Sequence, residues 1–198
     1  MGLNEAFENG ETPLEDEEKE GIKIKTISSK SELNEFEQQN IEDALAWITR
    51  KNLNQETILS QKFIRQVHHQ MFKNVWKWSG KFRKSDKNIG THHKEISVSL
   101  KILCDDTSYW IENKTFEPDE IAIRFKHKLV SIHCFPNGNG RHSRLMADII
   151  IEKVFGEKVF TWGMHSNISS IQLRETYIKS IRAADQNNFA PLLKFCRT

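Results

Sequence analysis

The chain has 198 residues, of which 37% are hydrophobic and 28% charged, and this length is enough for one domain with a buried core. Its formal net charge at pH 7 is +2, but residues 1–20 hold eight acidic residues and one lysine, so that segment carries −7 and the remainder +9. A basic body suits nucleotide phosphates, an acidic partner or nucleic acid, and the charge alone does not decide among them.

Three cysteines, Cys104, Cys134 and Cys196, are far apart and form no Cys-x-x-Cys pair. This pattern argues against a disulfide framework and favours a reducing, cytoplasmic environment. No apolar run approaches the roughly 20 residues that span a bilayer, and the first residues lack the basic and apolar regions of a signal peptide. We therefore expect a cytoplasmic protein that does not enter a membrane.

Residues 1–27 are acidic and poor in large apolar side chains, which predicts a partly flexible arm ahead of a domain at 28–198. The first helix is expected from Ser31, its cap, to about Lys51, and the second from about Asn54 to Phe72. The apolar face of the first helix is expected to comprise Leu33, Phe36, Ile41, Ala44, Leu45 and Ile48.

Residues 88–98 combine a turn-like Ile89-Gly90-Thr91 with an alternation of apolar residues that is typical of a strand. His92 and His93 in this segment could be a pair of metal ligands, but the sequence offers no third and fourth ligand nearby. The remaining pattern predicts a mainly α-helical fold, with helices at 100–113, 117–132, 145–154, 170–184 and 189–195.

The stretch from His133 to Arg144 lies between two of these helices and holds a histidine, two asparagines, two glycines and two arginines. Gly138 and Gly140 let the backbone turn sharply and approach a ligand. The N–H groups after Asn137 open a new helix, and such a helix start can bind phosphate. Asn-Gly-Asn-Gly alone is also an ordinary turn between helices.

The charged residues of this stretch favour a functional site. Arg141 and Arg144 share one face of the first turn, where their charge opposes the helix dipole, and two guanidiniums beside amide donors suit a polyphosphate. Asn137 offers an oxygen to Mg²⁺, and His133 can be a neutral base near pH 7. The combination indicates phosphoryl-group chemistry on a nucleotide, although the P-loop pattern is absent.

The same twelve residues match every fixed position of the Fic family signature, His-x-Phe-x-(Asp/Asn)-Gly-Asn-Gly-Arg-x-x-Arg. The resemblance extends from about Leu33 to Phe195. Within the family, Thr12-Pro13-Leu14 and residues 35–41 are most similar to the subgroup called mobile mystery protein B. The resemblance implies a single Fic-type helical bundle at 28–198 with a small β-hairpin flap at about 88–98.

The Fic resemblance implies transfer of AMP from ATP to a Ser, Thr or Tyr hydroxyl of a target protein. His133 would be the base, and Asn137 would bind Mg²⁺. The flap residues Ile96 and Val98 would hold an extended segment of the target as an added strand. The expected phosphate-binding residues are Gly138, Asn139, Gly140, Arg141 and Arg144.

Two positions bear on the chemistry. Many relatives carry an acid where this chain has Asn137, so its attraction for the metal is expected to be weaker. Relatives that phosphorylate carry Lys where this chain has Gly140, which favours AMP transfer. Two alternatives remain, namely transfer of phosphate or UMP on the same scaffold, and a catalytically silent nucleotide-binding or interaction protein. No nucleic-acid recognition motif is present, so direct nucleic-acid binding is not expected.

Regulation is also implied by the resemblance. Residues 28–32 fit five positions of the family's inhibitory pattern Ser/Thr-x-x-x-Glu-Gly/Asn, with Leu33 in place of the last. Glu32 would then pair with Arg144 as a self-inhibitory contact, and a plain helix cap is an equal alternative. The subgroup likeness implies a toxin-like protein restrained by a co-encoded regulatory or antitoxin-like partner. The target protein, the modified residue type and the oligomeric state are left open.

Overall fold

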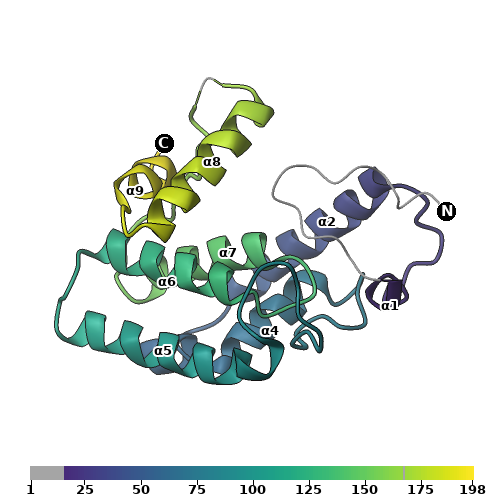
Figure 1. Cartoon of the computed structure of the whole chain (residues 1–198), viewed down its shortest axis with the longest axis horizontal. Coiled ribbons are helices and arrows are strands. Elements are labelled where there is room, and N and C mark those ends of the chain that lie inside the picture. The colour runs from purple at the N-terminus through teal and green to yellow at the C-terminus, as the bar shows by residue number, and fades with distance from the viewer. Residues whose placement is uncertain (1–15, 167) are drawn as a thin grey trace.

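A central pair of helices, joined by the signature loop, carries the other helices on its two sides. The computed structural model describes residues 16–166 and 168–198, and its elements are shown in Figure 1. They are α1 (Asp16–Lys19), α2 (Lys30–Thr49), α3 (Gln55–Ile58), α4 (Gln61–Phe72), the 3₁₀ helix η1 (His93–Glu95), α5 (Ile96–Glu112), α6 (Pro118–Ile132), α7 (Asn139–Lys153), α8 (Ser170–Asp185) and α9 (Ala190–Cys196). The expected mainly α-helical fold is confirmed.

The central pair is α6 and α7, which pack against each other along their lengths. Helix α5 packs on α6, α4 contacts both α5 and α7, and α2 packs on α4, while α8 and α9 pack together on the other side (Figure 1). Helix α7 is deeply buried on its inner face, since Met146, Ala147, Ile150 and Ile151 are fully buried. The signature loop therefore lies at one end of the buried centre of the domain.

Side chains set where the helices begin. Ser29, rather than the expected Ser31, caps α2 and forms a capping box with Glu32. The helix expected at 54–72 is interrupted, because Asn54 caps the single turn α3 and Ser60 then accepts a hydrogen bond from the backbone of Phe63 to start α4. A second cap inside an apolar pattern therefore divides it into two helices.

The inner face of α2 differs from the expected one. Phe36 and Leu45 are 44% and 45% exposed, whereas Glu37 and Asn40 are buried. Residues at steps of three and four form one stripe on a helix, and the stripe that faces α4 includes two polar side chains. Its buried members are Leu33, Glu37, Asn40, Ala44 and Ile48.

The described part of the N-terminal arm is docked on the domain. The backbone N–H of Lys23 donates to Val75 at 2.8 Å, the N–H of Lys77 donates to Gly21 at 2.8 Å, and Ile22 forms an isolated antiparallel bridge with Trp76. Four of the eight acidic residues of the expected arm lie before Asp16, outside the described residues.

The β-hairpin flap expected at 88–98 is not present, and this part of the prediction is wrong. Residues 93–95 form η1 and the chain enters α5 at Ile96, so α5 begins four residues earlier than expected. Ile96, Leu100, Leu103 and Thr107 are spaced by four, three and four residues and are all buried. The alternation over 96–100 was the start of this helical stripe rather than a strand.

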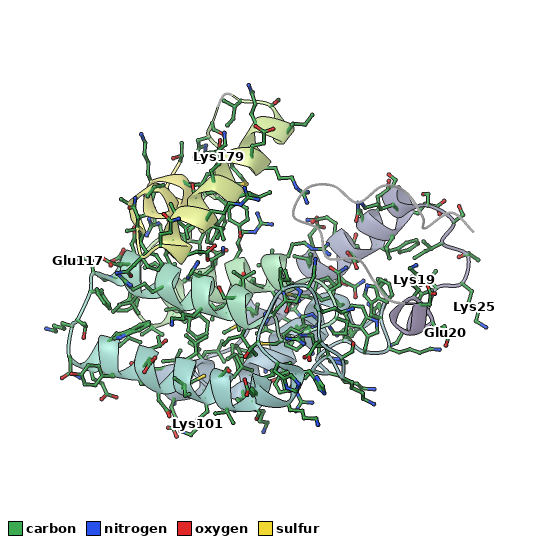
Figure 2. All side chains as sticks on the ribbon, viewed as in Figure 1. Lys19, Glu20, Lys25, Lys101, Glu117 and Lys179 are labelled. Carbon is green, nitrogen blue, oxygen red and sulfur yellow. The ribbon has the colours of Figure 1, made fainter. Side chains whose placement is uncertain are left out.

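The surface has the polar character that its composition predicts. The labelled side chains of Lys101 on α5 and Lys179 on α8 are exposed, as is that of Glu117, the residue before α6 (Figure 2). Among the described residues, none of the helices has both the length and the apolar character needed to cross a bilayer.

The two residues expected to act as a flap provide a direct test of the helical start of α5. Ile96 is fully buried and Val98 is 61% exposed. We expect Ile96→Ala to lower the free energy of unfolding by about 2–5 kcal/mol, the usual cost of truncating a buried aliphatic side chain. Val98→Ala should change it by less than about 0.5 kcal/mol. Urea denaturation would measure both, and equal small losses would instead indicate a solvent-exposed hairpin.

Candidate active site

His133 ends α6 in the left-handed conformation, with φ 55° and ψ 60°. This turn lets the chain leave the helix and enter the signature loop, and it leaves the side chain only 5% exposed. Burial lowers the pKa of His133 to about 4, with the charges of Arg83 and Lys87 acting in the same direction and a hydrogen bond to the backbone of Val130 opposing them. The imidazole is therefore neutral at pH 7 and can accept a proton.

Arg83 fixes the segment that passes beside this histidine. Its fully buried guanidinium donates from Nε to the His133 carbonyl at 2.6 Å, from Nη1 to the Ser85 carbonyl at 2.8 Å and from Nη2 to the Thr91 carbonyl. Two backbone hydrogen bonds join the segment 83–91 to the end of α6. The Arg83 N–H donates to the Cys134 carbonyl at 3.0 Å, and the Thr91 N–H donates to the Ile132 carbonyl at 3.2 Å. Residues 84–90 therefore form a loop anchored at both ends next to His133.

His68 of α4 holds the signature loop in place through hydrogen bonds and stacking. Its Nδ1 accepts from the Gly80 N–H at 3.0 Å, so the ring proton is on Nε2, which donates to the Asn137 carbonyl at 3.0 Å. Its ring stacks on Phe135 with centroids 3.7 Å apart. Complete burial keeps its pKa well below the usual range. His68 is therefore a fully buried core histidine.

The interior of the loop is locked by a side chain of the signature itself. Asn139 is 4% exposed, and its amide accepts from the Phe135 N–H at 3.0 Å and donates to the Phe135 carbonyl at 2.8 Å. Its side chain is therefore structural, and a role in phosphate binding is left to its backbone N–H. His142, to which the sequence assigned no role, is also buried and donates from Nε2 to the Ile64 carbonyl at 2.9 Å.

The two signature glycines have different environments. Gly138 has φ +77°, and a Cβ added to it would lie 2.6 Å from ring carbons of Phe72. Gly140 lies in the first turn of α7, and a Cβ there would meet no atom within 4 Å. The N–H groups of Asn139, Gly140 and Arg141 have no acceptor within the helix because of their position. The helix start is thus open in front of Gly140, as an anion site requires.

Arg141 is paired with an acid that the sequence did not single out. Its Nη2 lies 2.6 Å from Oε2 of Glu37, which is on the inner face of α2, and its guanidinium lies over the Phe72 ring at 5.1 Å. The other oxygen of Glu37 accepts from Nε1 of Trp76 at 2.5 Å. The sequence does place Glu37 on the same helix face as Leu33 and Ala44, which hinted at a buried glutamate. The sequence pattern could not show that its partner is Arg141.

Arg144 lies one turn further along α7 and faces α8. Its guanidinium is 5.6 Å from the centre of the Tyr177 ring, and the same ring lies 4.6 Å from the buried amine of Lys126. Burial lowers the pKa of Lys126. Arg144 and Lys126 thus bring positive charge between α6, α7 and α8, beside the start of α7.

Glu32 is not at this site. Its carboxylate accepts from the backbone N–H of Ser28 at 2.8 Å and of Ser29 at 3.3 Å, which is the helix-cap role left open by the sequence. Those hydrogen bonds lower its pKa. No ion pair joins Glu32 to Arg144 among residues 16–166 and 168–198.

Asn137 is half-buried, and its Oδ1 accepts from the Gly138 N–H at 2.6 Å. A carbonyl oxygen has a second lone pair, so this side chain can still offer a neutral ligand to a magnesium ion. The loop thus gathers His133, Asn137 and the start of α7 with its two arginines. It does not include Ile96, which is buried in α5.

Comparison with known proteins agrees with this geometry. Residues 58–151 match the Fic/DOC family. The curated protein adenylyltransferase Fic of Aedes aegypti is 26% identical over 159 residues, which cover 78% of this chain and 30% of that protein. The chain thus spans about a third of the length of the curated relatives it matches.

Solved structures show the same fold. The N-terminal Fic domain of Bep8 from Bartonella sp. 1-1C superposes with a TM-score of 0.68 at 14% identity, covering 88% of this chain and 89% of that one. BepC from Bartonella tribocorum, solved with bound AMPPNP, gives a TM-score of 0.67 at 15% identity and covers 92% of this chain and 97% of that one. At these identities the likeness concerns the fold.

The contrast between the two glycines gives a prediction. Gly138→Ala should lower the free energy of unfolding by more than about 2 kcal/mol, because a left-handed alanine costs about 1–2 kcal/mol and its Cβ would also displace Phe72. Gly140→Ala should leave stability within about 1 kcal/mol of the wild type or raise it, since alanine is the better helix former. Thermal unfolding of both variants measures this, and equal effects would contradict the two environments.

Proposed function

Since residues 58–151 match the Fic/DOC family, we propose that the chain is a protein adenylyltransferase that moves AMP from ATP to a Ser, Thr or Tyr hydroxyl of a target protein. The observation that carries the proposal is the neutral, buried His133 next to a helix start that holds Arg141 and Arg144. The curated relatives bear the name protein adenylyltransferase, which supports the same activity here.

The proposed reaction is a displacement at the α-phosphorus of ATP. The target hydroxyl oxygen forms a bond to that phosphorus, the bond from phosphorus to the bridging oxygen of the β-phosphate breaks, and pyrophosphate leaves. The hydroxyl proton passes to the neutral imidazole of His133. Backbone N–H groups of Gly138, Asn139 and Gly140, together with Arg141 and Arg144, would bind the phosphates and stabilise the charge that develops on pyrophosphate.

ATP is the proposed substrate because two solved relatives contain AMPPNP and ADP. Asn137 would hold Mg²⁺ through Oδ1 together with phosphate oxygens of the nucleotide, and Mg²⁺ supplies charge neutralisation to the leaving group. With a neutral oxygen from the protein, we expect weak metal binding until ATP is present.

The target would approach past the anchored loop 84–90. Because Ile96 is inside the domain, the docking strand expected from a flap cannot involve its side chain, and Val98 is available only on the outer side of α5. We propose in addition, on the likeness to the mobile mystery protein B subgroup, that a co-encoded antitoxin-like protein restrains a toxin-like activity in the cytoplasm.

Two carboxylates on α2 bear on inhibition. A pairing of Glu32 with Arg144 would require the Glu32 carboxylate to leave the capping box, so Glu32→Gly should raise the labelling rate only if that exchange occurs. Glu37 already neutralises Arg141 at 2.6 Å. A polyphosphate that binds Arg141 would have to compete with Glu37 for the guanidinium.

Two other functions remain as alternatives. Transfer of phosphate or UMP on the same scaffold would use the same base and arginines. A silent nucleotide-binding protein would keep the helix start without needing a base of tuned pKa.

Isotopic labelling separates these alternatives. The protein would be incubated with Mg²⁺ and a cell lysate, with ATP labelled at either the α- or the γ-phosphate. We expect protein-bound label from the α position only, lost with EDTA and reduced at least 100-fold in His133→Ala, since a general base contributes about 10²–10⁴-fold. Label from the γ position would indicate phosphorylation.

The matched control is His165→Ala, which removes an exposed histidine far along the chain from the signature. It should label as the wild type does. If no label transfers from either position while AMPPNP still binds, the protein would be a nucleotide-binding protein without this activity.

The lowered pKa of His133 predicts the pH profile. The neutral base dominates above pH 4, so kcat/KM should fall on the acid side near pH 4. Between pH 7 and 5 the loss should be less than about twofold, whereas a base of ordinary pKa 6.5 would lose about 25-fold. A fall centred at 6.5 would contradict burial of the base.

Circular dichroism at each pH must accompany that profile. The pKa values of His68, His133 and His142 are all lowered in the folded protein. Their contribution to stability is therefore complete above pH 6.5 and is lost progressively as the pH falls below that value. The values of kcat/KM can be interpreted only at pH values where circular dichroism shows that the protein remains folded.

A further inference from the structure

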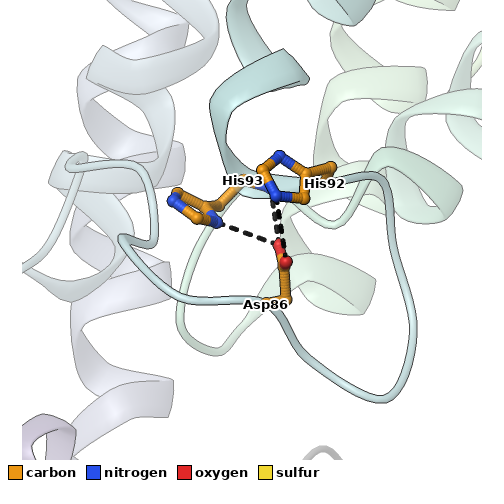
Figure 3. Close-up of side chains that lie close together, drawn as sticks. All are labelled: Asp86, His92 and His93. Carbon is orange, nitrogen blue, oxygen red and sulfur yellow. Dashed lines mark hydrogen bonds and ion pairs between the residues drawn. The ribbon is translucent and has the colours of Figure 1, made fainter.

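The loop anchored beside His133 brings together three side chains that the proposed reaction does not use. Asp86 lies before the turn of this loop, and His92 and His93 follow it (Figure 3). Oδ2 of Asp86 is 3.2 Å from Nε2 of His92, and its Oδ1 is 3.0 Å from Nδ1 of His93. We propose that Asp86, His92 and His93 bind a divalent transition-metal ion of the zinc type.

The donor set is one that such an ion prefers. Two imidazole nitrogens and one carboxylate leave a fourth tetrahedral position for water or another ligand, and imidazole ligands distinguish zinc-type ions from Mg²⁺ and Ca²⁺. In the sequence the pair His92-His93 had no visible third ligand. The fold supplies that ligand from a residue six positions upstream of His92.

The spacing of the three donor atoms suits one ion after a small adjustment. They all lie within 4.8 Å of one another. Two ligand atoms on one tetrahedral zinc ion lie about 3.3 Å apart, so the side chains must draw together by at most about 1.5 Å. Asp86 and His92 are about half exposed, with side-chain exposures of 51% and 48%, and exposed side chains can rotate by this amount.

The carboxylate is also held in place before any ion arrives. The backbone N–H of His93 donates to Oδ1 of Asp86 at 2.8 Å, and η1 starts at His93 with the His92 ring as its cap. A neutral imidazole can present either nitrogen as a lone pair by carrying its proton on the other. An ion on Nε2 of His92 would move the ring proton to Nδ1 and release the 3.4 Å hydrogen bond from the Lys94 N–H. The ion would take the place that ring protons now have between the imidazoles and Asp86.

One neighbouring charge opposes the ion. Nη1 of Arg83 is 3.5 Å from Oδ1 of Asp86, so a dication at this site would face a buried guanidinium. Arg83 is already bound to three carbonyl oxygens and is not available to move away. The expected site is therefore weaker than a four-ligand structural zinc site.

Binding would close the loop at its base. The ion would join Asp86 to His92 and His93, while Thr91 between them contacts Ile132 through its backbone. Because Ile132 and His133 are consecutive, an ion at this site would stiffen the segment past which a target protein is proposed to approach. Binding of the ion would thus couple the concentration of the metal to the access of a target protein to His133.

The test uses the full chain without a polyhistidine tag or nucleotide, titrated with Zn²⁺ in competition with a chromophoric chelator. We expect one equivalent to bind, with the Kd raised at least tenfold in His92→Ala and in Asp86→Ala. His165→Ala, which removes another exposed histidine, should bind as the wild type does. A large excess of Mg²⁺ should not displace Zn²⁺.

Hydrogen exchange gives a second measurement that does not depend on affinity. Zn²⁺ should slow amide exchange in residues 84–95 of the wild type and of His165→Ala, and not in His92→Ala. His92→Ala is the most informative variant, because its ring is about half exposed. Thermal unfolding of the apo variant checks that losing the cap on η1 leaves the domain folded.

The proposal would be overturned by either of two outcomes. Absence of Zn²⁺ binding above that of His92→Ala would remove the site. One equivalent that binds His92→Ala and Asp86→Ala with unchanged affinity would place the ion elsewhere in the chain.

Discussion

One buried imidazole connects the parts from which the signature loop is built. His68 accepts a hydrogen bond from Gly80 and donates one to Asn137, so its two nitrogens join the segment after α4 to the loop before α7. Both bonds require the neutral ring with its proton on Nε2. A charged ring would lose the Gly80 bond and place an unpaired charge in the core. The position of Phe135, stacked on this ring, and hence of the residues on either side of it, depends on that one tautomer.

A second constraint, the side chain of Arg83, fixes the backbone around His133. Arg83 places a fully buried cation against the carbonyls of Ser85, Thr91 and His133, and the cost of burying its charge is offset by hydrogen bonds to all three. The backbone around the base is thus fixed by Arg83, which lies 50 positions before His133 in the sequence. This enclosure excludes water from the His133 side chain and keeps it neutral, so the fold itself sets the proton affinity of the base.

The sequence predicted the helices and the site to different degrees. The signature identified His133, Asn137 and the helix start, because those residues are local and carry their chemistry in their spacing. It could not find Glu37, since a glutamate on an apolar helix face is interpretable only when its partner across the interface is known. The hairpin prediction was wrong because the apolar residues at 96, 98 and 100 were interpreted with the two-residue period of a strand. The same residues also fit the start of helix α5. Ser60 divided one expected helix into two by a capping bond that propensity does not reveal.

The contact of Gly138 with the face of Phe72 has a consequence for protein engineering. The twelve signature residues are contiguous and look like a portable cassette, but Gly138 lies against an aromatic ring supplied by α4. A designer who transplanted the loop onto another helix pair would have to bring the flat surface beneath it, together with a histidine in the place of His68. The smallest transferable unit is therefore a three-helix assembly of α4, α6 and α7 with the loop between the last two, and sequence searches for the loop alone will count more candidates than can hold its shape.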